Sequence, residues 1–389
     1  FNEEVRIAAA QTLPELLKSF VEGASKGMGP TEDNCRQIAA EMWPHLVESL
    51  AKEVDPDVVH IMLQSVQEMV DVAKGPMIMP VDLMGPVFDA FQQVLKDYEE
   101  RRDLRMERTV GEDFDAEEEE ALMEEHEAES ELLDALGNSL TSILKLYGDA
   151  ALQFVEALLP SFYDFLGPAR YVEERRVALI LMDDVIQYSP AGAAKYTNHV
   201  LPQLLQGSRD QNAGVRQSCV YGLGRTAEHR QADFRPHVQT AVSIVMTIIN
   251  DPEARNEDNI LATENAVGAL GKFLEFHPEC MDPTAGTLFV QNLPLTEDDE
   301  EARVVHPQLV RLVSANDTRI LGPSNANLAK IMEVLVKVLG HGEKLISAED
   351  APAAVALVKQ LNGAVPGAFE SSLSTLKPKQ QEAVMAMLR

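Results

Sequence analysis

The side chains with the clearest chemical potential in this sequence are the carboxylates between Glu112 and Asp134. These 23 residues contain thirteen Asp and Glu and no Lys or Arg, so nearly half of the net charge of −30 lies here. Unpaired carboxylates at this density repel one another, and we expect a mobile loop or an exposed helix. The stretch would attract Lys- and Arg-rich proteins over a screening length of roughly 8 Å. A solvated insertion between two helices is the alternative interpretation.

The candidate ligands for a basic partner are the first seven carboxylates of this stretch and an adjacent pair farther along the chain. They are Glu112, Asp113, Asp115, Glu117, Glu118, Glu119, Glu120, Asp183 and Asp184. The pair falls early on a predicted helix, where it would form a second acidic point on a concave face. A helix-capping role, or a ladder between turns, explains this pair at least as well.

Two short motifs formally match cofactor or metal sites, and both lack the context that such sites need. Residues 222–227 read G-x-G-x-x-A, but no strand precedes them, so close contact between helices explains these glycines better than a dinucleotide site. Residues 277–280 supply two neighbouring ligands without the second pair of a zinc site. The sequence has no G-x-S-x-G, P-loop or H-E-x-x-H motif. We therefore predict neither an enzyme nor a bound cofactor.

The composition also narrows the classes of partner. A net charge of −30 argues against direct binding of nucleic acid or of an anionic membrane, because both need Lys and Arg on the protein surface. No apolar run approaches the roughly 18 residues of a membrane span. This charge is compatible with basic protein partners, although strong acidity by itself often serves only solubility.

A unit of about forty residues must position these side chains. Its clearest copy contains an apolar helix with Pro202, a polar turn with Asp210, and a second apolar helix that Val215 and Arg216 open. Spacings of 40, 47 and 40 residues separate the aligned positions Arg176, Arg216, Thr263 and Arg303. Asp210 is expected to pair with the Arg of its own unit or of a neighbour. A helix pair of this size cannot bury its apolar face alone, so the units must stack into an all-α solenoid.

The copy around Asp210 resembles the HEAT consensus, which has Pro, Asp, Val and Arg at this spacing. We therefore predict a single right-handed α-solenoid of HEAT-type helical hairpins over residues 1–389, with an acidic insertion at about 110–131. Helices at about 82–108 and 132–147 would flank the insertion. Because the sequence opens on Phe1 in the middle of a repeat, we expect it to be part of a longer protein.

Several segments resemble one HEAT family in particular, the importin-beta (karyopherin-beta) nuclear transport receptors. Within that family they are most similar to the C-terminal third of the karyopherin-beta three branch, also called importin five. The segments that carry the resemblance are 5–10, 182–186, 215–224, 262–265, 293–298 and 321–328. The acidic stretch before Leu132 also falls where that branch has one.

This resemblance implies a nuclear import receptor that shuttles between cytoplasm and nucleus. Its partners would be cargo proteins with basic signals, phenylalanine-glycine nucleoporins and the Ran GTPase. Ran would bind mainly through N-terminal repeats that this chain lacks. The alternative is a HEAT scaffold without a transport role, which would organise a multiprotein complex such as that of a phosphatase.

Overall fold

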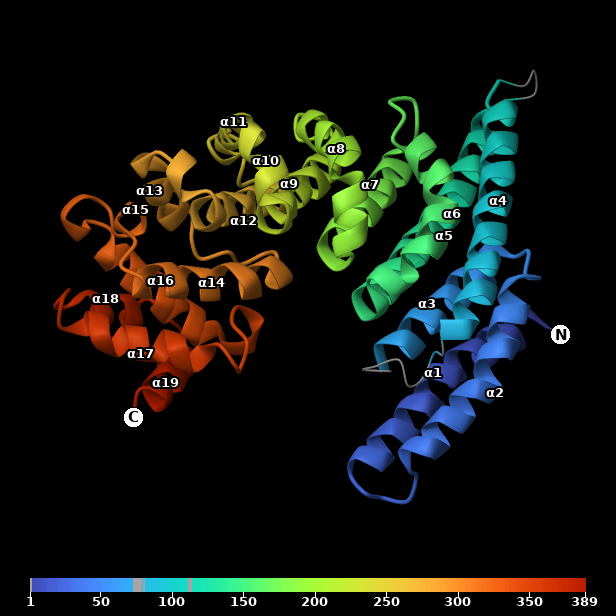
Figure 1. Cartoon of the computed structure of the whole chain (residues 1–389), viewed down its shortest axis with the longest axis horizontal. Helices are drawn as coiled ribbons and strands as arrows, with labels where there is room; N and C mark the ends of the chain where they lie inside the picture. Colours follow the sequence, from blue (N-terminus) through green and yellow to red (C-terminus); the bar gives the residue numbers. More distant parts are fainter. Residues whose placement is uncertain (1, 73–78, 80, 111–113) are drawn as a thin grey trace. The chain divides into compact units, whose positions relative to one another are not determined.

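The computed structural model describes residues 2–72, 79, 81–110 and 114–389 (Figure 1). These residues form α-helices and short 3₁₀ helices, and none of them forms a β-strand. The chain divides into two compact units, Phe1–Lys195 and Tyr196–Arg389. In the described ranges, no helix is both long and apolar enough to cross a bilayer.

The first unit consists of helices in two layers. In one layer α1, α3, α5 and α7 pack side by side in that order, and in the other α2, α4 and α6 do the same. This stacking of successive helical hairpins is the arrangement that the repeat predicts. The helices are α1 (Glu3–Ser25), α2 (Glu32–Leu50), α3 (Pro56–Val72), α4 (Met84–Arg108), α5 (Ala116–Tyr147), α6 (Asp149–Phe165) and α7 (Val172–Tyr188), with the 3₁₀ helix η1 (Val81–Leu83) before α4.

Apolar side chains at helical spacing hold these layers together. On α5, Leu133, Leu136 and Leu140 are fully buried, one helical turn apart. Between them the hydroxyl of Ser139 donates to the backbone carbonyl of Leu63 on α3, at 2.9 Å. The second half of α5 is therefore a core element of the unit.

The second unit is built around α12, which packs against α9, α11 and α14. Every residue from Ala262 to Leu274 on this helix is buried, so its polar side chains need partners inside the protein. The helices α8 (Pro190–Gly207), which contains the boundary between the units, and α9 (Ala213–His229) come first. They are followed by α10 (Gln231–Phe234), α11 (Val238–Ile249), α12 (Ile260–Phe276), α13 (Pro283–Gln291), α14 (Asp299–Ser314), α15 (Thr318–Leu321), α16 (Leu328–His341), α17 (Ala351–Asn362), α18 (Ala368–Ser374) and α19 (Pro378–Met387). Short 3₁₀ helices η2 (Arg235–His237), η3 (Pro278–Cys280), η4 (Pro323–Asn325) and η5 (Gly342–Lys344) lie between them.

Residues 222–227, which match the G-x-G-x-x-A pattern, lie inside α9, where the glycines let another helix pack closely. A Cβ atom at Gly224 would lie 3.2 Å from the Cα atom of Ala269 on α12, which is closer than most side chains tolerate. Because the motif is helical and has no strand before it, no dinucleotide-binding turn forms.

The repeat residues hold the turn between α8 and α9. Arg216 meets Asp210 through the backbone, since Nη1 donates to the carbonyls of Asp210 and Gln211 at 2.8 and 2.7 Å. Its Nη2 donates to Asn259 Oδ1, just before α12, and so connects two successive hairpins. Val215 is buried, and Pro202 lies within α8.

Candidate functional site

The acidic stretch forms the first half of α5. Asp115 caps this helix, because its carboxylate accepts hydrogen bonds from the backbone N–H groups of Glu117 and Glu118, both at 3.0 Å. Glutamates in the first turn are also favoured by the helix dipole. The predicted start of the packed helix at about residue 132 is therefore wrong, and the described acidic residues from Ala116 onward belong to it. Glu112 and Asp113 lie outside the described residues.

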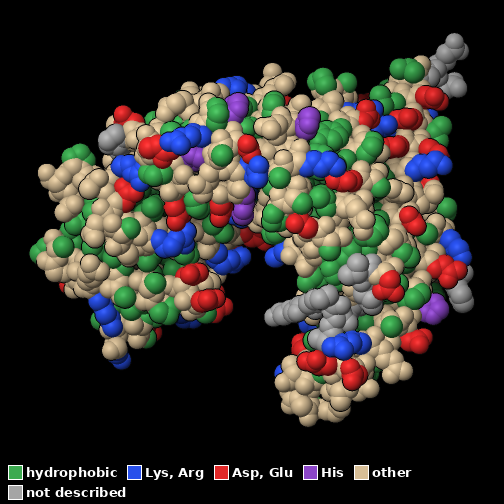
Figure 2. Space-filling view, viewed as in Figure 1, with side chains coloured by type: hydrophobic (Ala, Val, Ile, Leu, Met, Phe, Trp, Pro, Cys, Tyr) green, Lys and Arg blue, Asp and Glu red, His purple; other side chains and the backbone are tan. Residues whose placement is uncertain are grey.

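One face of α5 is neutralised by arginines of α4. Arg108 Nε donates to Glu118 at 2.7 Å, and its Nη1 donates to Glu125 at 2.8 Å. Acidic and basic side chains accordingly lie next to each other over α4 and α5 in the space-filling view (Figure 2). We call Glu118 and Glu125 the paired face of α5.

Deeper between the same helices the ion pairs are buried. Glu129 of α5 accepts hydrogen bonds from Arg101, and Arg105 Nη1 lies 3.5 Å from the same carboxylate. Arg102 Nη1 donates to the fully buried Glu174 of α7 at 2.8 Å. Because removing one partner of a buried pair leaves an uncompensated charge, these residues serve stability.

The opposite face of α5 carries carboxylates without arginines. This face has four exposed glutamates, Glu119, Glu120, Glu124 and Glu127. Within the described residues, none of the four forms an ion pair. Together with Glu173 of α7 they line a hollow of about 720 Å³. Met123 stands among them with 67% of its surface exposed. We call this set the open face: Glu119, Glu120, Met123, Glu124 and Glu127.

The edge of the hollow is fixed by a ring contact between α5 and the start of α7. His126 lies on Tyr171, with 4.3 Å between the ring centroids, and its Nε2 lies 3.5 Å from Glu173. The backbone N–H of Tyr171 donates to Glu174, at 2.9 Å. These contacts hold the start of α7 against α5 at the edge of the hollow.

Asp183 and Asp184 do not contribute to an acidic surface. They lie on α7 with only 1% and 5% of their surface exposed. Thr141 of α5 donates to Asp184 Oδ2 at 2.5 Å, which connects the two helices. The predicted second acidic point is wrong because both carboxylates are turned into the packed layer.

Of the open-face residues, Glu119 and Glu120 are among the candidates predicted from the sequence, whereas Glu124, Glu127 and Met123 are not. The available signal was their helical spacing, since residues three, four, seven and eight positions apart share one face of a helix. The prediction was based on charge density instead, and the carboxylates are densest at the N-terminal end of the stretch.

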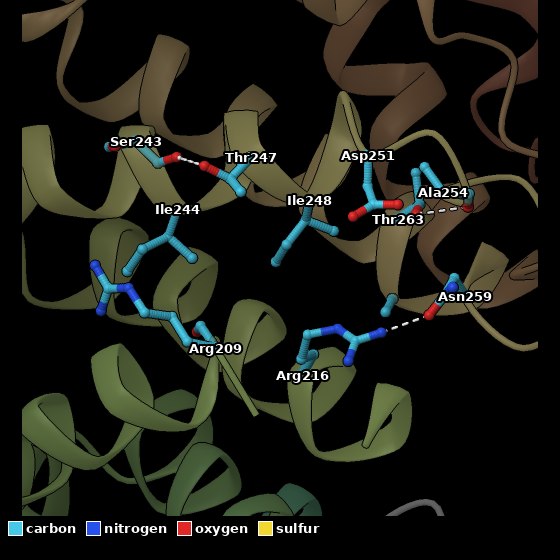
Figure 3. Close-up of a pocket in the computed structure, with 12 residues that line it drawn as sticks. Arg209, Arg216, Ser243, Ile244, Thr247, Ile248, Asp251, Ala254, Asn259 and Thr263 are labelled. Carbon is cyan, nitrogen blue, oxygen red and sulfur yellow. Dashed lines mark hydrogen bonds between the residues drawn. The ribbon is translucent and has the colours of Figure 1, made fainter. Parts of the chain in front are cut away.

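A second pocket, of about 350 Å³, lies in the other unit between the α8–α9 turn and α11 (Figure 3). Ile244 and Ile248 point toward Arg209 and Arg216 across it. Arg209 Nη1 already donates to the Leu205 carbonyl at 2.8 Å, as Arg216 does to its own turn. The Thr263 hydroxyl in the lining likewise donates to a backbone carbonyl, that of Ala254, at 2.8 Å.

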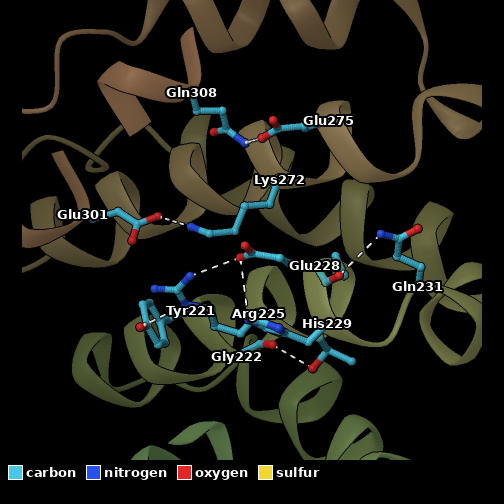
Figure 4. A network of polar contacts seen from close by, with 12 residues as sticks. Tyr221, Gly222, Arg225, Glu228, His229, Gln231, Lys272, Glu275, Glu301 and Gln308 are labelled. Atoms are coloured by element: carbon cyan, nitrogen blue, oxygen red, sulfur yellow. Dashed lines mark hydrogen bonds and ion pairs between the residues drawn. The ribbon is translucent and has the colours of Figure 1, made fainter. Parts of the chain in front are cut away.

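A network of charges crosses α9, α12 and α14 in the same unit (Figure 4). Lys272 of α12 pairs with Glu301 of α14, and Arg225 of α9 donates to Glu228 at 3.1 Å and to the Tyr221 hydroxyl at 3.0 Å. In the part of the chain that the structure describes, no group of three or more His, Cys, Asp or Glu is arranged to hold a metal ion. These contacts satisfy the polar side chains of a buried helix.

Comparison with known proteins gives these features a family context. The importin repeat 6 family model matches residues 58–168, which include the open face. The probable importin-5 homolog of Dictyostelium discoideum is 22% identical over 376 residues, or 90% of this chain and 33% of that protein. The importin subunit beta-3 of Saccharomyces cerevisiae is 24% identical over 250 residues, or 62% of this chain and 22% of that protein. The chain thus spans at most a third of the length of these relatives.

Solved structures agree on the architecture. The crystal structure of Kap121p matches 100% of this chain and 33% of its own length, with a TM-score of 0.77 and 20% sequence identity. That likeness confirms the predicted all-α solenoid. The family model, the named relatives and the shared fold all point to the importin-beta family, to which the repeat segments of the sequence are also similar.

Proposed function

We propose that the chain is the C-terminal third of a nuclear import receptor of the karyopherin-beta three, or importin five, branch. Its relatives carry the names importin-5 homolog and importin subunit beta-3. Kap121p, which shares its fold, has been solved bound to RanGTP, to Ste12p and to Nup53p. In this proposal the full-length protein shuttles between cytoplasm and nucleus and binds Ran, phenylalanine-glycine nucleoporins and basic cargo.

The open face of α5 is our proposed contact for basic cargo segments. The observation that carries this proposal is the division of charge on one helix. Glu118 and Glu125 are matched by Arg108, whereas the four open-face glutamates face solvent. From Glu119 to Glu127 these carboxylates extend over about 12 Å of helix, which suits a short segment with several Lys or Arg.

The import function of the full-length receptor is tested with Ran. We expect Ran loaded with GTP to bind the full-length protein more tightly than Ran loaded with GDP, and to release a bound basic cargo. Equal retention of the two nucleotide forms in a pull-down would contradict the transport function.

The open face is tested by removing two charges from either face of α5. We expect Glu119→Gln with Glu124→Gln to raise the Kd for a Lys- and Arg-rich peptide roughly tenfold at about 0.02 M salt, and much less at about 0.5 M, where screening dominates. Fluorescence anisotropy at both salt concentrations measures the change.

The matched control is Glu118→Gln with Glu125→Gln, which alters the net charge equally but lies on the paired face. The pairs that it breaks are with the exposed Arg108, and such surface ion pairs contribute little to stability. We expect a clearly smaller change in Kd for this control. An equal loss of affinity in both double variants would mean that only the total charge matters, and the open face would then not be the binding surface.

A further inference from the structure

The groove between α4 and α5 contains a buried arginine that lacks a full set of partners. Arg105 lies on α4 with only 4% of its surface exposed. Its Nη1 lies 3.5 Å from the Glu129 carboxylate, which is beyond the usual range of a hydrogen bond. Within the described residues, its Nε and Nη2 have no hydrogen-bond partner. Burying donors without acceptors costs free energy, so proteins rarely keep such groups without an ion, a ligand or a water molecule.

The carboxylates around Arg105 are already engaged by other arginines. Arg101 donates to both oxygens of Glu129, through Nε and Nη2. Two arginines therefore share the single charge of this buried carboxylate. Arg108, one turn farther along α4, is matched by the paired face of α5. The ion pairs among the described residues thus leave one positive charge at Arg105 without a match.

The groove around this charge has room for a small ligand. Its volume is about 290 Å³, and arginines at helical spacing line it along α4, Arg105 among them. Apolar side chains from three helices complete much of the lining. They are Pro56 of α3, Leu104 of α4 and Ala128 of α5. Leu104 has 59% of its surface exposed, so a ligand could still cover apolar area there.

We infer that this groove binds a carboxylate carried on a short aliphatic group. The planar guanidinium of Arg105 matches the two oxygens of a carboxylate. A carboxylate also brings the single negative charge that balances one unmatched cation. Asp57 and Glu125 line the same groove and would repel a phosphate dianion more strongly. The aliphatic part of the ligand covers Leu104 and Ala128.

Binding requires a change of side-chain rotamer at the rim, because the unpartnered nitrogens of Arg105 are shielded from solvent. Arg101 and Arg108 have side chains that are 27% and 40% exposed. Rotamer changes of this kind are common when a ligand binds. The inference does not depend on the proposed function, since it concerns an acidic ligand and a groove beside the paired face of α5.

The experiment uses the whole 389-residue chain and three small probes at constant ionic strength and neutral pH. Isovalerate carries the carboxylate and the aliphatic group, isovaleramide has the same shape without the charge, and acetate has the charge without the branched aliphatic group. We expect isovalerate to bind with a Kd of about 1 mM, and both control probes at least about tenfold more weakly. Titration followed by the amide NMR signals of α4 and α5 measures these constants and locates the site.

Two variants of equal charge test the role of Arg105. Arg105→Met should raise the Kd for isovalerate at least about tenfold. It should also leave the free energy of unfolding equal or higher, because it removes a buried charge that has no full partner. Arg36→Met, which changes a 54% exposed arginine of α2, should keep the affinity. An unchanged Kd in Arg105→Met would overturn the inference.

The probes and two peptides keep the inference testable even if Arg105→Met does not fold. Equal binding of isovalerate and isovaleramide to the unmodified chain would overturn it, because the groove would then recognise only apolar shape. A capped peptide with Glu followed by Leu presents the same groups on a protein segment, and Gln in place of Glu gives its control. Tighter binding of the Glu peptide than of isovalerate would identify a protein segment as the ligand, and weaker binding would identify a free acid. Failure of both to bind would reject the site.

Discussion

Replacing Lys272 with Met should lower the free energy of unfolding of the unit 196–389 by about 3–5 kcal/mol. Lys272 and Glu301 are only 2% and 4% exposed, and they pair between α12 and α14 (Figure 4). The substitution leaves the Glu301 carboxylate buried without its closest cation, which costs far more than loss of a surface pair. Urea unfolding at neutral pH, followed by circular dichroism, measures the effect, and hydrogen exchange of α12 amides locates it.

Two further variants test the cause of that loss. Lys272→Met combined with Glu301→Leu should regain most of the stability, because no isolated charge remains in the core. Gly268→Ala changes no charge, yet its Cβ would overlap the Glu301 carboxylate, so it should destabilise the same helices. If Lys272→Met alone costs less than about 1 kcal/mol, Arg225 compensates the carboxylate and the pair is not the main contact.

Acidification from pH 6.5 to pH 4 should remove about 3 kcal/mol of stability through His306 alone. This buried ring accepts a hydrogen bond at Nε2 from the Leu295 N–H at 3.2 Å and donates from Nδ1 to the Leu345 carbonyl at 2.8 Å. Both contacts fit the neutral ring, and burial lowers the pKa of His306 from 6.5 to about 4. Between these values the unfolded chain binds a proton that the folded chain does not. The contribution is therefore complete above pH 6.5 and is lost as the pH falls to about 4.

Carboxylates titrate in the same range, so the measurement is a difference between two proteins. The gap in unfolding free energy between the unmodified chain and His306→Gln should shrink by about 3 kcal/mol from pH 7 to pH 4. Urea titrations at half-unit pH steps give this gap directly. A gap that stays constant with pH would show that His306 does not titrate between those values.

Helical periodicity predicted the fold because each hairpin buries a regular apolar stripe. It placed the helix 82–108 within two residues of α4, whose end at Arg108 is observed. The predicted start of this next helix, at about residue 132, was wrong for a physical reason, since α5 begins at Ala116. Charge density within the stretch suggested repulsion, but Asp115 caps the helix, and Arg101 and Arg108 pair with its glutamates from outside the stretch.

The division of α5 into two faces depends on its neighbour and cannot be read from the stretch itself. A partial signal existed, since Arg101, Arg105 and Arg108 recur on α4 at helical spacing and match the spacing of Glu118 and Glu125. For Asp184 no such signal was available. Whether a helix face meets solvent or another helix is decided by stacking between repeats, which local sequence does not specify.

The unpaired glutamates of the open face also affect the stability of the helical turns that carry them. Like charges at positions 120, 124 and 127 weaken the turns that carry them, whereas the second half of the same helix is held by buried leucines. A cationic ligand removes that repulsion, so binding and stiffening of the outer turns of α5 are linked parts of one free-energy change. In the proposed receptor, cargo binding would therefore stiffen the outer turns of α5, a helix whose second half lies in the core of the unit.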